Sequence, residues 1–276
     1  MAFLPKQELQ RFLAEDLGKG DITSKLLQKQ QVTARIFTRQ EAVIAGTNFA
    51  KQIFTLKNCR TQIKTKDGRK AKVNQVILQI KGDATAILSC ERTVLNLLSR
   101  MCGIATKTNK LSRIIIKSNP RIKLLATRKT APGLRYFDKY AVKIGGGEKH
   151  RMTLNDMIMF KDNHLTIEKS IPNLISKAKK MRKNVEIEVE NQKDAILAAK
   201  HRANIIMLDN FKPRQVKNTI KKLNDLNLRK KVSIEVSGGI NEKNISQFAK
   251  TGIDMISVGE ITNSPPSIDL SLEIKL

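Results

Sequence analysis

The sequence predicts an α/β fold in two parts, of which the second is built from repeated β/α units. The chain has 276 residues, 40% of them hydrophobic, so it can bury a substantial core. From about residue 120 onward, short β-branched apolar runs alternate with longer amphipathic segments. The first 110 residues lack that alternation. This difference indicates that they form a separate unit.

Six apolar runs in the second part are typical of buried parallel strands. They are Ile122–Ala126 (IKLLA), Asp156–Phe160 (DMIMF), Val185–Val189 (VEIEV), Asn204–Leu208 (NIIML), Val232–Val236 (VSIEV) and Asp254–Val258 (DMISV). Helical spacing is found between them, as in Gln192–Arg202 and in Asn241–Gly252, whose final glycine suits a helix C-cap. The alternation favours a parallel sheet, and the number of units favours a closed barrel with the helices outside. An open, doubly wound sheet is the alternative.

The N-terminal part predicts a mixed α+β unit. It begins with a helical pattern, QELQRFLAEDLG, continues with the strand-like stretches VTARIFTRQEAVIAG and KVNQVILQIKG, and ends with an apolar helical pattern at Thr85–Thr106. No long Pro-, Gly- or Ser-rich linker follows it. We therefore expect residues 1–110 to form the first domain and residues 111–264 the second, with residues 265–276 able to return to the first.

The sequence has no pattern typical of a membrane or exported protein. No window reaches the about 18 consecutive apolar residues of a membrane span, and the N-terminus lacks the order of a signal peptide. Cys59, Cys90 and Cys102 are odd in number and far apart, which predicts buried thiols rather than a disulfide framework or a zinc site. We expect a cytoplasmic protein.

The chain is strongly basic, with a formal net charge of +27. Such an excess is compatible with nucleic acid, an anionic substrate or a lysine-rich solvated surface. The charge is spread along the chain, and with 4% aromatic residues there are few platforms on which bases could stack. A nucleic-acid-binding protein is therefore the competing class, and we expect no specific nucleic-acid partner.

Polar residues follow each predicted strand, where β/α barrels place their functional groups. The residues concerned are Arg128, Lys129, Lys161, Asp162, Glu190, Asp209, Asn210, Ser237, Gly238, Gly239 and Gly259. Glu190 and Asp209 together suit Mg²⁺, which binds one or two carboxylates and completes its shell with water and phosphate oxygens. The alternative is that these carboxylates cap the helices that follow.

The glycine-containing turns after the last two strands suit a phosphate. Ser237–Gly239 and Gly259 offer backbone N–H groups at the position where barrels often bind phosphate, although ordinary turn chemistry would account for them too. Positive charge gathers nearby, because Arg128, Lys129, Lys161 and the pair His150 and Arg151 belong to the same predicted mouth. A mixture of Arg and Lys suits a ligand with both carboxylate and phosphate groups.

Eight motifs in a fixed order extend this interpretation over nearly the whole chain. They are EDLGKGDITS, ERTVLNLLSRMCGIAT, TRKTAPGLR, KYAVKIGGGEKHR, FKDNHL, EIEVEN, IIMLDN and EVSGGI. In this order they resemble the quinolinate phosphoribosyltransferases, the carboxylating nicotinate-nucleotide pyrophosphorylases. The resemblance implies an N-terminal α/β sandwich followed by an incomplete α/β barrel. It also implies transfer of phosphoribose from phosphoribosyl pyrophosphate to quinolinate with loss of CO₂, in NAD biosynthesis and with Mg²⁺.

The resemblance also implies roles for single residues. Arg128, His150, Arg151 and Lys161 are similar to the groups that hold the two quinolinate carboxylates, and Lys129 lies near both substrates. Arg92 resembles an arginine that the family lends across a dimer interface, so a homodimer with shared sites is implied. The remaining positions are ligands of Mg²⁺ and the ribose phosphate (Glu190, Asp209) and the cradle of the 5′-phosphate (Ser237, Gly238, Gly239, Gly259).

Some positions depart from the family pattern. Thr153 stands where Gly is common, and Glu260 and Asn263 stand where Ala and His are usual. The segment between Glu190 and Asp209 is about two residues short, which leaves Glu188 as the alternative to Glu190. The glycines at 145–147 either turn the chain or move as a lid. Competing activities are a molybdenum-transport-associated relative of the family and a nicotinate phosphoribosyltransferase, which would release no CO₂.

Overall fold

The computed structural model describes residues 5–275, and these divide into two compact units. The first contains residues 5–109, 130–146 and 261–275, and the second contains residues 110–129 and 147–260. The division therefore differs from the expected domains of residues 1–110 and 111–264 in three places: residue 110 lies in the second unit, and residues 130–146 and 261–264 lie in the first. Each unit is described below by itself.

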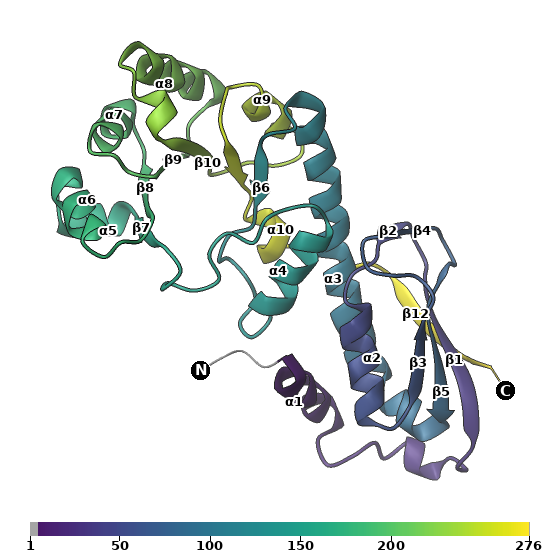
Figure 1. The fold of residues 1–276 in the computed structure, drawn as a ribbon. Helices are drawn as coiled ribbons and strands as arrows, with labels where there is room; N and C mark the ends of the chain where they lie inside the picture. The colour runs from purple at the N-terminus through teal and green to yellow at the C-terminus, as the bar shows by residue number, and fades with distance from the viewer. Residues whose placement is uncertain (1–4, 276) are drawn as a thin grey trace. The chain divides into compact units, whose positions relative to one another are not determined.

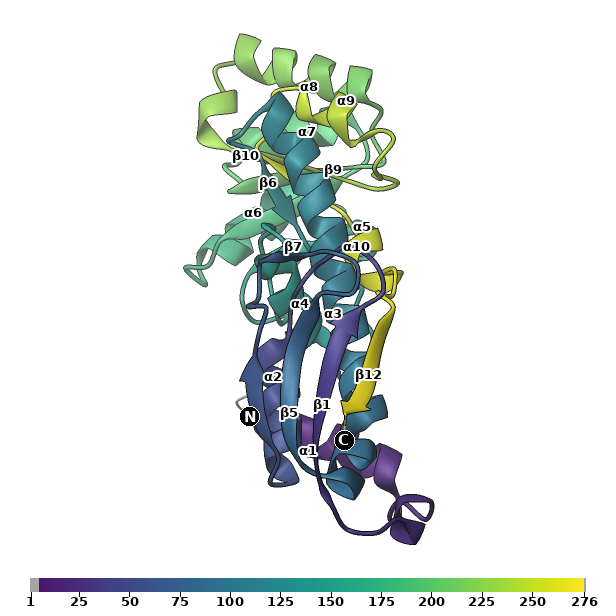
Figure 2. The ribbon, with the colours of Figure 1, turned by 90° about the vertical axis from the view of Figure 1, so that its right-hand side faces the viewer.

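An antiparallel sheet forms the centre of the first unit, in the strand order β12-β1-β5-β3 (Figures 1 and 2). Its strands are β1 (Gln31–Thr38), β3 (Arg60–Ile63), β5 (Val76–Asp83) and β12 (Leu270–Lys275). Alternate residues of β1, such as Val32, Ala34 and Ile36, are buried, as expected for a sheet with one covered face. The pairing of β12 with β1 returns the C-terminal segment to this unit.

Helices and a small ribbon complete the first unit. They are α1 (Pro5–Leu17), η1 (Ser24–Leu26), α2 (Thr47–Leu56), α4 (Arg135–Ile144), and the two-stranded ribbon of β2 (Ala42–Val43) and β4 (Lys70–Ala71). The long helix α3 (Ala84–Ser118) begins here and continues beyond the division at residue 109. It extends past the expected end at Thr106, because Leu111 and Ile115 keep the helical spacing of buried apolar residues.

The second unit contains a six-stranded parallel sheet in the order β6-β11-β10-β9-β8-β7. The strands are β6 (Lys123–Leu125), β7 (Ile158–Phe160), β8 (Val185–Val189), β9 (Ile205–Asp209), β10 (Ser233–Ser237) and β11 (Met255–Ser257). All six expected strands are confirmed. No pairing between β6 and β7 closes the sheet among the described residues, so the fold is an incomplete barrel.

Helices cover the outer side of the barrel strands (Figure 1). They are α5 (Asp162–Ile167), α6 (Ile171–Lys179), α7 (Gln192–Lys200), α8 (Pro213–Asp225), η2 (Arg229–Lys231) and α9 (Ile245–Ala249), and α10 (Glu260–Asn263) follows β11 at the division. Helix α9 is shorter than the expected Asn241–Gly252. It follows a turn at residues 241–244, in which the Asn244 side chain accepts a hydrogen bond from the Asn241 N–H and the Asn241 carbonyl accepts one from the Ile245 N–H.

The glycine run has a structural explanation in the first unit. Helix α4 ends at Gly145, where an added Cβ would lie 2.5 Å from the Ala105 carbonyl oxygen and 2.6 Å from the Thr108 Cβ. Gly146 has a φ of 93°, a value that side chains disfavour. Close packing on α3 and a left-handed turn therefore account for Gly145 and Gly146.

No helix in the described part of the chain is long and apolar enough to cross a membrane.

A polar barrel mouth as candidate active site

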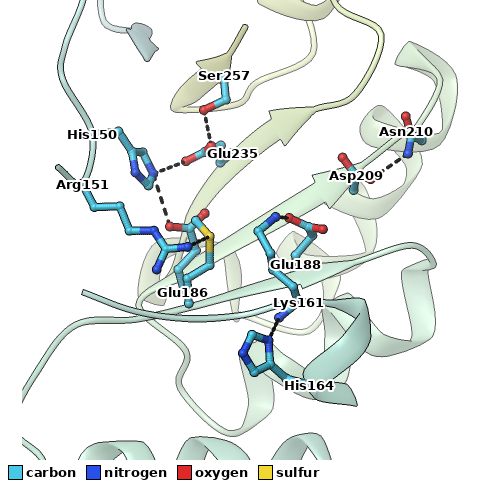
Figure 3. Close-up of polar contacts among 11 residues, drawn as sticks. His150, Arg151, Lys161, His164, Glu186, Glu188, Asp209, Asn210, Glu235 and Ser257 are labelled. Atoms are coloured by element: carbon cyan, nitrogen blue, oxygen red, sulfur yellow. Dashed lines mark hydrogen bonds and ion pairs between the residues drawn. The ribbon is translucent and has the colours of Figure 1, made fainter. Parts of the chain in front are cut away.

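The interior face of β8 bears carboxylates instead of the usual branched apolar residues. Side chains alternate along a strand, so Glu186 and Glu188 share one face and Glu190, just past the strand, continues it. The register aligns Glu188 with Met207 of β9, and Met207 with Glu235 of β10. Acidic residues of two strands therefore line the same interior, as Figure 3 shows.

Two of the predicted lysines lie at the mouth with these carboxylates. Lys161, which follows β7, forms an ion pair with Glu188, and its backbone N–H donates to His164 Nδ1 over 3.0 Å. Lys129 follows β6 and is exposed. An added Cβ on Gly259 would lie 3.3 Å from the Lys129 side chain, so a glycine at this position lets the lysine lie across it.

Asp209, at the end of β9, is the acidic counterpart of these cations. Burial raises the pKa of its carboxyl, the charges of Lys161 and Lys129 lower it, and that of Glu190 raises it again. Asn210 Nδ2 donates to Asp209 Oδ2 over 2.6 Å, and Asn210 itself has a φ of 56°. The predicted pair Glu190 and Asp209 is thus close enough to interact, and Glu190 is exposed.

The predicted phosphate turn lies beside Asp209. Ser237, the last residue of β10, pairs with Asp209 in the parallel register. Gly238 and Gly239 follow with φ values of 89° and 59°. An added Cβ on Gly238 would lie 2.2 Å from the Asn210 side-chain oxygen, so only glycine fits there. The turn leaves its backbone close to the mouth.

Two guanidinium groups add positive charge to this unit. Burial lowers the pKa of Arg151 and the charge of Arg128 lowers it further, whereas the charges of Glu186 and Glu188 raise it. Arg151 is 9% exposed, and its Nη2 donates to Met159 Sδ over 3.0 Å. Like charges held this close favour an anion between or beside them.

The side chain of His150 is only 9% exposed and contacts two buried carboxylates. Its Nε2 is 3.3 Å from Glu186 Oε2 and 3.4 Å from Glu235 Oε2, and both carboxylates have 0% exposed side chains (Figure 3). Ser257 of β11 donates a hydrogen bond of 2.5 Å to Glu235 Oε1. The backbone of His150 also adopts an uncommon conformation, with a φ of 53°.

Glu186, Glu235 and Ser257 lie within strands and not just past them, so they are not among the residues predicted for the site. The signal that could have found the two carboxylates is the period of two within VEIEV and VSIEV, which places them on the same face as Glu190 and Ser237. The second unit brings together the predicted residues Arg128, Lys129, His150, Arg151, Lys161, Glu190, Asp209, Ser237, Gly238, Gly239 and Gly259. Arg92 belongs to the first unit, on α3, and is exposed.

Comparison with known protein families matches two domain models that together span most of the chain. The quinolinate phosphoribosyl transferase N-terminal domain matches residues 21–102, and the C-terminal domain of the same family matches residues 104–273. Among curated proteins, the probable carboxylating nicotinate-nucleotide pyrophosphorylase of Archaeoglobus fulgidus is 41% identical over 92% of this chain and 98% of its own length. The Bacillus subtilis protein of the same name is 38% identical over 98% of this chain and 93% of its own length.

Solved structures agree with these matches. The nicotinate-nucleotide pyrophosphorylase of Francisella tularensis has a TM-score of 0.91 and 38% identity, covering 99% of this chain and 98% of that one. The Ehrlichia chaffeensis structure has a TM-score of 0.93 and 33% identity, with full coverage of both (100% and 100%). With two family models matched and curated relatives 38% and 41% identical over nearly their full length, this chain belongs to the quinolinate phosphoribosyl transferase family.

Proposed function

We propose that this protein transfers phosphoribose from phosphoribosyl pyrophosphate to quinolinate and releases CO₂, giving nicotinate mononucleotide and pyrophosphate. Membership of the family and the names of its relatives support this activity. The observation that carries it most directly is the arrangement of cations around an acidic barrel mouth. Arg128, Arg151, Lys129 and Lys161 offer more positive charge than a mononegative substrate needs, and both proposed substrates are polyanions.

The two substrates use different parts of the mouth. Arg128, Arg151 and Lys161 bind the two quinolinate carboxylates, and His150 adds a positive charge from the barrel interior. Arginine suits this work because its planar fork matches a carboxylate. Ser237, Gly238, Gly239 and Gly259 supply backbone N–H groups for the ribose 5′-phosphate. The Lys129 side chain lies over Gly259 and so reaches both substrates.

The chemistry depends on electrostatic stabilisation more than on a proton-shuttling base. The pyridine nitrogen bonds to C1 of the ribose as the bond from C1 to pyrophosphate breaks, and its electron pair leaves with pyrophosphate. Lys129 meets the growing negative charge. The ring nitrogen becomes cationic and stabilises the electron pair left behind when the adjacent carboxylate departs as CO₂. That carbon then takes a proton from solvent.

Mg²⁺ is part of this proposal, with Glu190 and Asp209 as its protein ligands. These residues fit a divalent cation, because they are two carboxylates whose charges interact. Burial and the charge of Glu190 raise the pKa of Asp209 although Lys161 and Lys129 lower it, so a further cation beside the pair would stabilise the ionised form. A bound Mg²⁺ supplies charge neutralisation for the pyrophosphate group.

The choice between Glu190 and Glu188 as the metal ligand has a direct test. Glu188 is paired with Lys161, whereas Glu190 is exposed at the mouth. We expect Glu190→Gln to raise the Mg²⁺ concentration for half-maximal activity about tenfold, since it removes one charged ligand. Glu188→Gln should instead raise the KM for quinolinate, by releasing Lys161. The reverse pattern in the two titrations would assign the metal to Glu188.

We also propose a cytoplasmic homodimer in which Arg92 completes the neighbouring subunit's site. Cys59, Cys90 and Cys102 are all buried and free, as suits a reducing compartment. Arg92 is exposed on α3, where a second copy could accept it. Because the proposed substrates are polyanions, Arg92 would add a further favourable charge to the neighbouring subunit's site.

The proposed activity is tested by incubating purified protein with phosphoribosyl pyrophosphate and Mg²⁺, and with quinolinate or nicotinate as the acceptor. We expect nicotinate mononucleotide from quinolinate and little product from nicotinate, because nicotinate lacks the second carboxylate that the arginines bind. Lys161→Ala is the control for a contaminating activity and should lower the rate strongly. Acceptance of nicotinate alone would replace this proposal with a nicotinate phosphoribosyltransferase.

A further inference from the structure

Glu186 and Glu235 have no assigned role in the reaction above, although they form a cluster with His150. The cluster is buried in the barrel interior, on β8, β10 and the segment before β7. The ligating atoms of the three side chains lie within 4.8 Å of one another. Among the described residues, neither oxygen of Glu186 has a hydrogen bond of good geometry, and Glu235 Oε2 has none either. Two buried carboxylates this close need either a cation beside them or a proton on one of them.

From this geometry we propose that Glu186 and Glu235 are positioning residues that keep His150 charged and aim it at quinolinate. This inference rests on the proposed function for its substrate. Both carboxylates contact Nε2, which leaves Nδ1 as the ring donor for a bound carboxylate. Ser257 fixes Glu235 from behind through its hydrogen bond. His150 would thus be a permanent cation at neutral pH, unlike an ordinary histidine.

The charges around the ring favour a proton over a metal ion as the cation. Burial and the charge of Glu235 raise the pKa of Glu186, whereas His150 and Arg151 lower it. With His150 and Arg151 both charged, two positive groups balance the two carboxylates of Glu186 and Glu235. Arg151 interacts electrostatically with Glu186, and a divalent ion at the cluster would lie near that guanidinium. Arg128 adds further positive charge on the same side.

The expected titration follows from the same contacts. Burial alone lowers the pKa of His150, but the two carboxylates outweigh it and raise the pKa to about 9. Because the pKa is raised, the stability that the charged ring contributes is complete below about pH 6.5. It is lost as the pH rises through about 9. The KM for quinolinate should therefore stay flat between these values and increase above the upper one.

The direct test is an NMR titration of the histidine rings in the wild-type protein without substrate. The chain has only three histidines, and His150→Asn assigns the signal of interest. We expect His150 to titrate near pH 9. Titration near the ordinary value, or a bound metal ion in stoichiometric amount that Glu186→Gln removes, would overturn the proposal.

Two variants then connect the charge to substrate binding. Glu186→Gln and Glu235→Gln each remove one negative charge and should lower the pKa of His150. At pH 8 the KM for quinolinate should rise about tenfold while kcat and the KM for phosphoribosyl pyrophosphate change less, since only one anion contact is weakened. Lowering the pH to 6 should recharge the ring and restore the KM. A KM defect that ignores pH would indicate a merely structural role.

Glu188→Gln is the matched control, because it makes the same change on the same strand but pairs with Lys161. It should leave the His150 titration unchanged. If the Gln variants fail to fold, the wild-type titration still decides the point. A high His150 pKa in a protein that does not bind quinolinate would sink the proposed function and leave the positioning pair intact.

Discussion

A side chain at position 238 would occupy space that Asn210 already fills. The added Cβ would lie 2.2 Å from Asn210 Oδ1 and 2.7 Å from its backbone nitrogen. Asn210 in turn donates to Asp209. Gly238 therefore leaves room for Asn210, which contacts both the proposed phosphate turn and Asp209 at the mouth.

Replacing Gly238 with alanine should weaken phosphoribosyl pyrophosphate binding. We expect the KM for phosphoribosyl pyrophosphate to rise about tenfold to a hundredfold, since displacing the backbone donors costs about 1–3 kcal/mol of binding free energy. The measurement is steady-state kinetics with quinolinate saturating. Gly239→Ala is the control: its φ of 59° is also positive, but no atom lies within 4 Å of the added Cβ. Equal effects of the two variants would contradict the steric account.

At the residue level, strand ends could be predicted from sequence and the deeper interior could not. The end of a strand can be recognised in the sequence by a polar residue that follows an apolar run, as Asp209 does. Glu186 lies inside such a run, and its burial depends on His150 and Glu235, which come from distant segments. No local pattern encodes that neighbourhood, although the period of two places Glu186 on the interior face.

At the scale of elements, the clearest non-local contact in the first unit joins α3 to α4. Arg100 Nε and Nη2 donate to the two carboxylate oxygens of Asp138, over 2.7 and 2.8 Å. Asp138 is fully buried, and burial raises the pKa of its carboxyl despite the opposing effect of Arg100. Arg100 also donates to the Thr262 carbonyl. The bridge thus connects three stretches of sequence.

Removing the arginine should destabilise the first unit strongly. Arg100→Ala leaves the Asp138 charge buried without its partner, and we expect a loss of about 3 kcal/mol in the free energy of unfolding. Urea denaturation followed by circular dichroism measures it. Lys177→Ala breaks the exposed ion pair with Glu168 and should cost less than about 1 kcal/mol. Similar losses in both variants would show that burial does not make the Arg100 bridge stronger.

Element boundaries were predictable where periodicity alone decides them. The six barrel strands were, because parallel strands buried on both faces are short and β-branched. The end of α3 and the start of α9 were not. In α3 the polar segment after Thr106 stays helical because only two of its positions, Leu111 and Ile115, need to be apolar. In α9 the turn at residues 241–244 falls within the expected helical pattern, so periodicity does not separate the turn from the helix.

At the scale of the whole molecule, each of the two units is built from more than one stretch of the sequence. The amino-acid composition does not change where the chain passes from one unit to the other, so it does not predict this division. Residues 130–146 belong with the first unit although they follow the first barrel strand. The reason lies in contacts made by α4, including the Arg100–Asp138 bridge and the packing of Gly145 on α3. The family resemblance predicted the two kinds of domain correctly, and tertiary contacts set the division between them.

The proposed sharing of sites between subunits predicts complementation. Arg92→Ala and Lys129→Ala should each be nearly inactive alone. Mixed after dissociation and reassociation, they should recover about a quarter of wild-type activity, because half of the dimers are mixed and each of those holds one intact site. The measurement needs differently tagged chains, so that mixed dimers are isolated. Inactive mixed dimers would refute the shared site.

The central claim is that transfer and decarboxylation are coupled at one cationic mouth. The most direct measurement uses quinolinate labelled separately in each carboxylate and follows labelled CO₂ together with nicotinate mononucleotide. We predict that CO₂ comes only from the carboxylate next to the ring nitrogen, in equal amount to the nucleotide, and only when phosphoribosyl pyrophosphate is present. Release of CO₂ without phosphoribosyl pyrophosphate, or nucleotide formed without CO₂, would contradict the account.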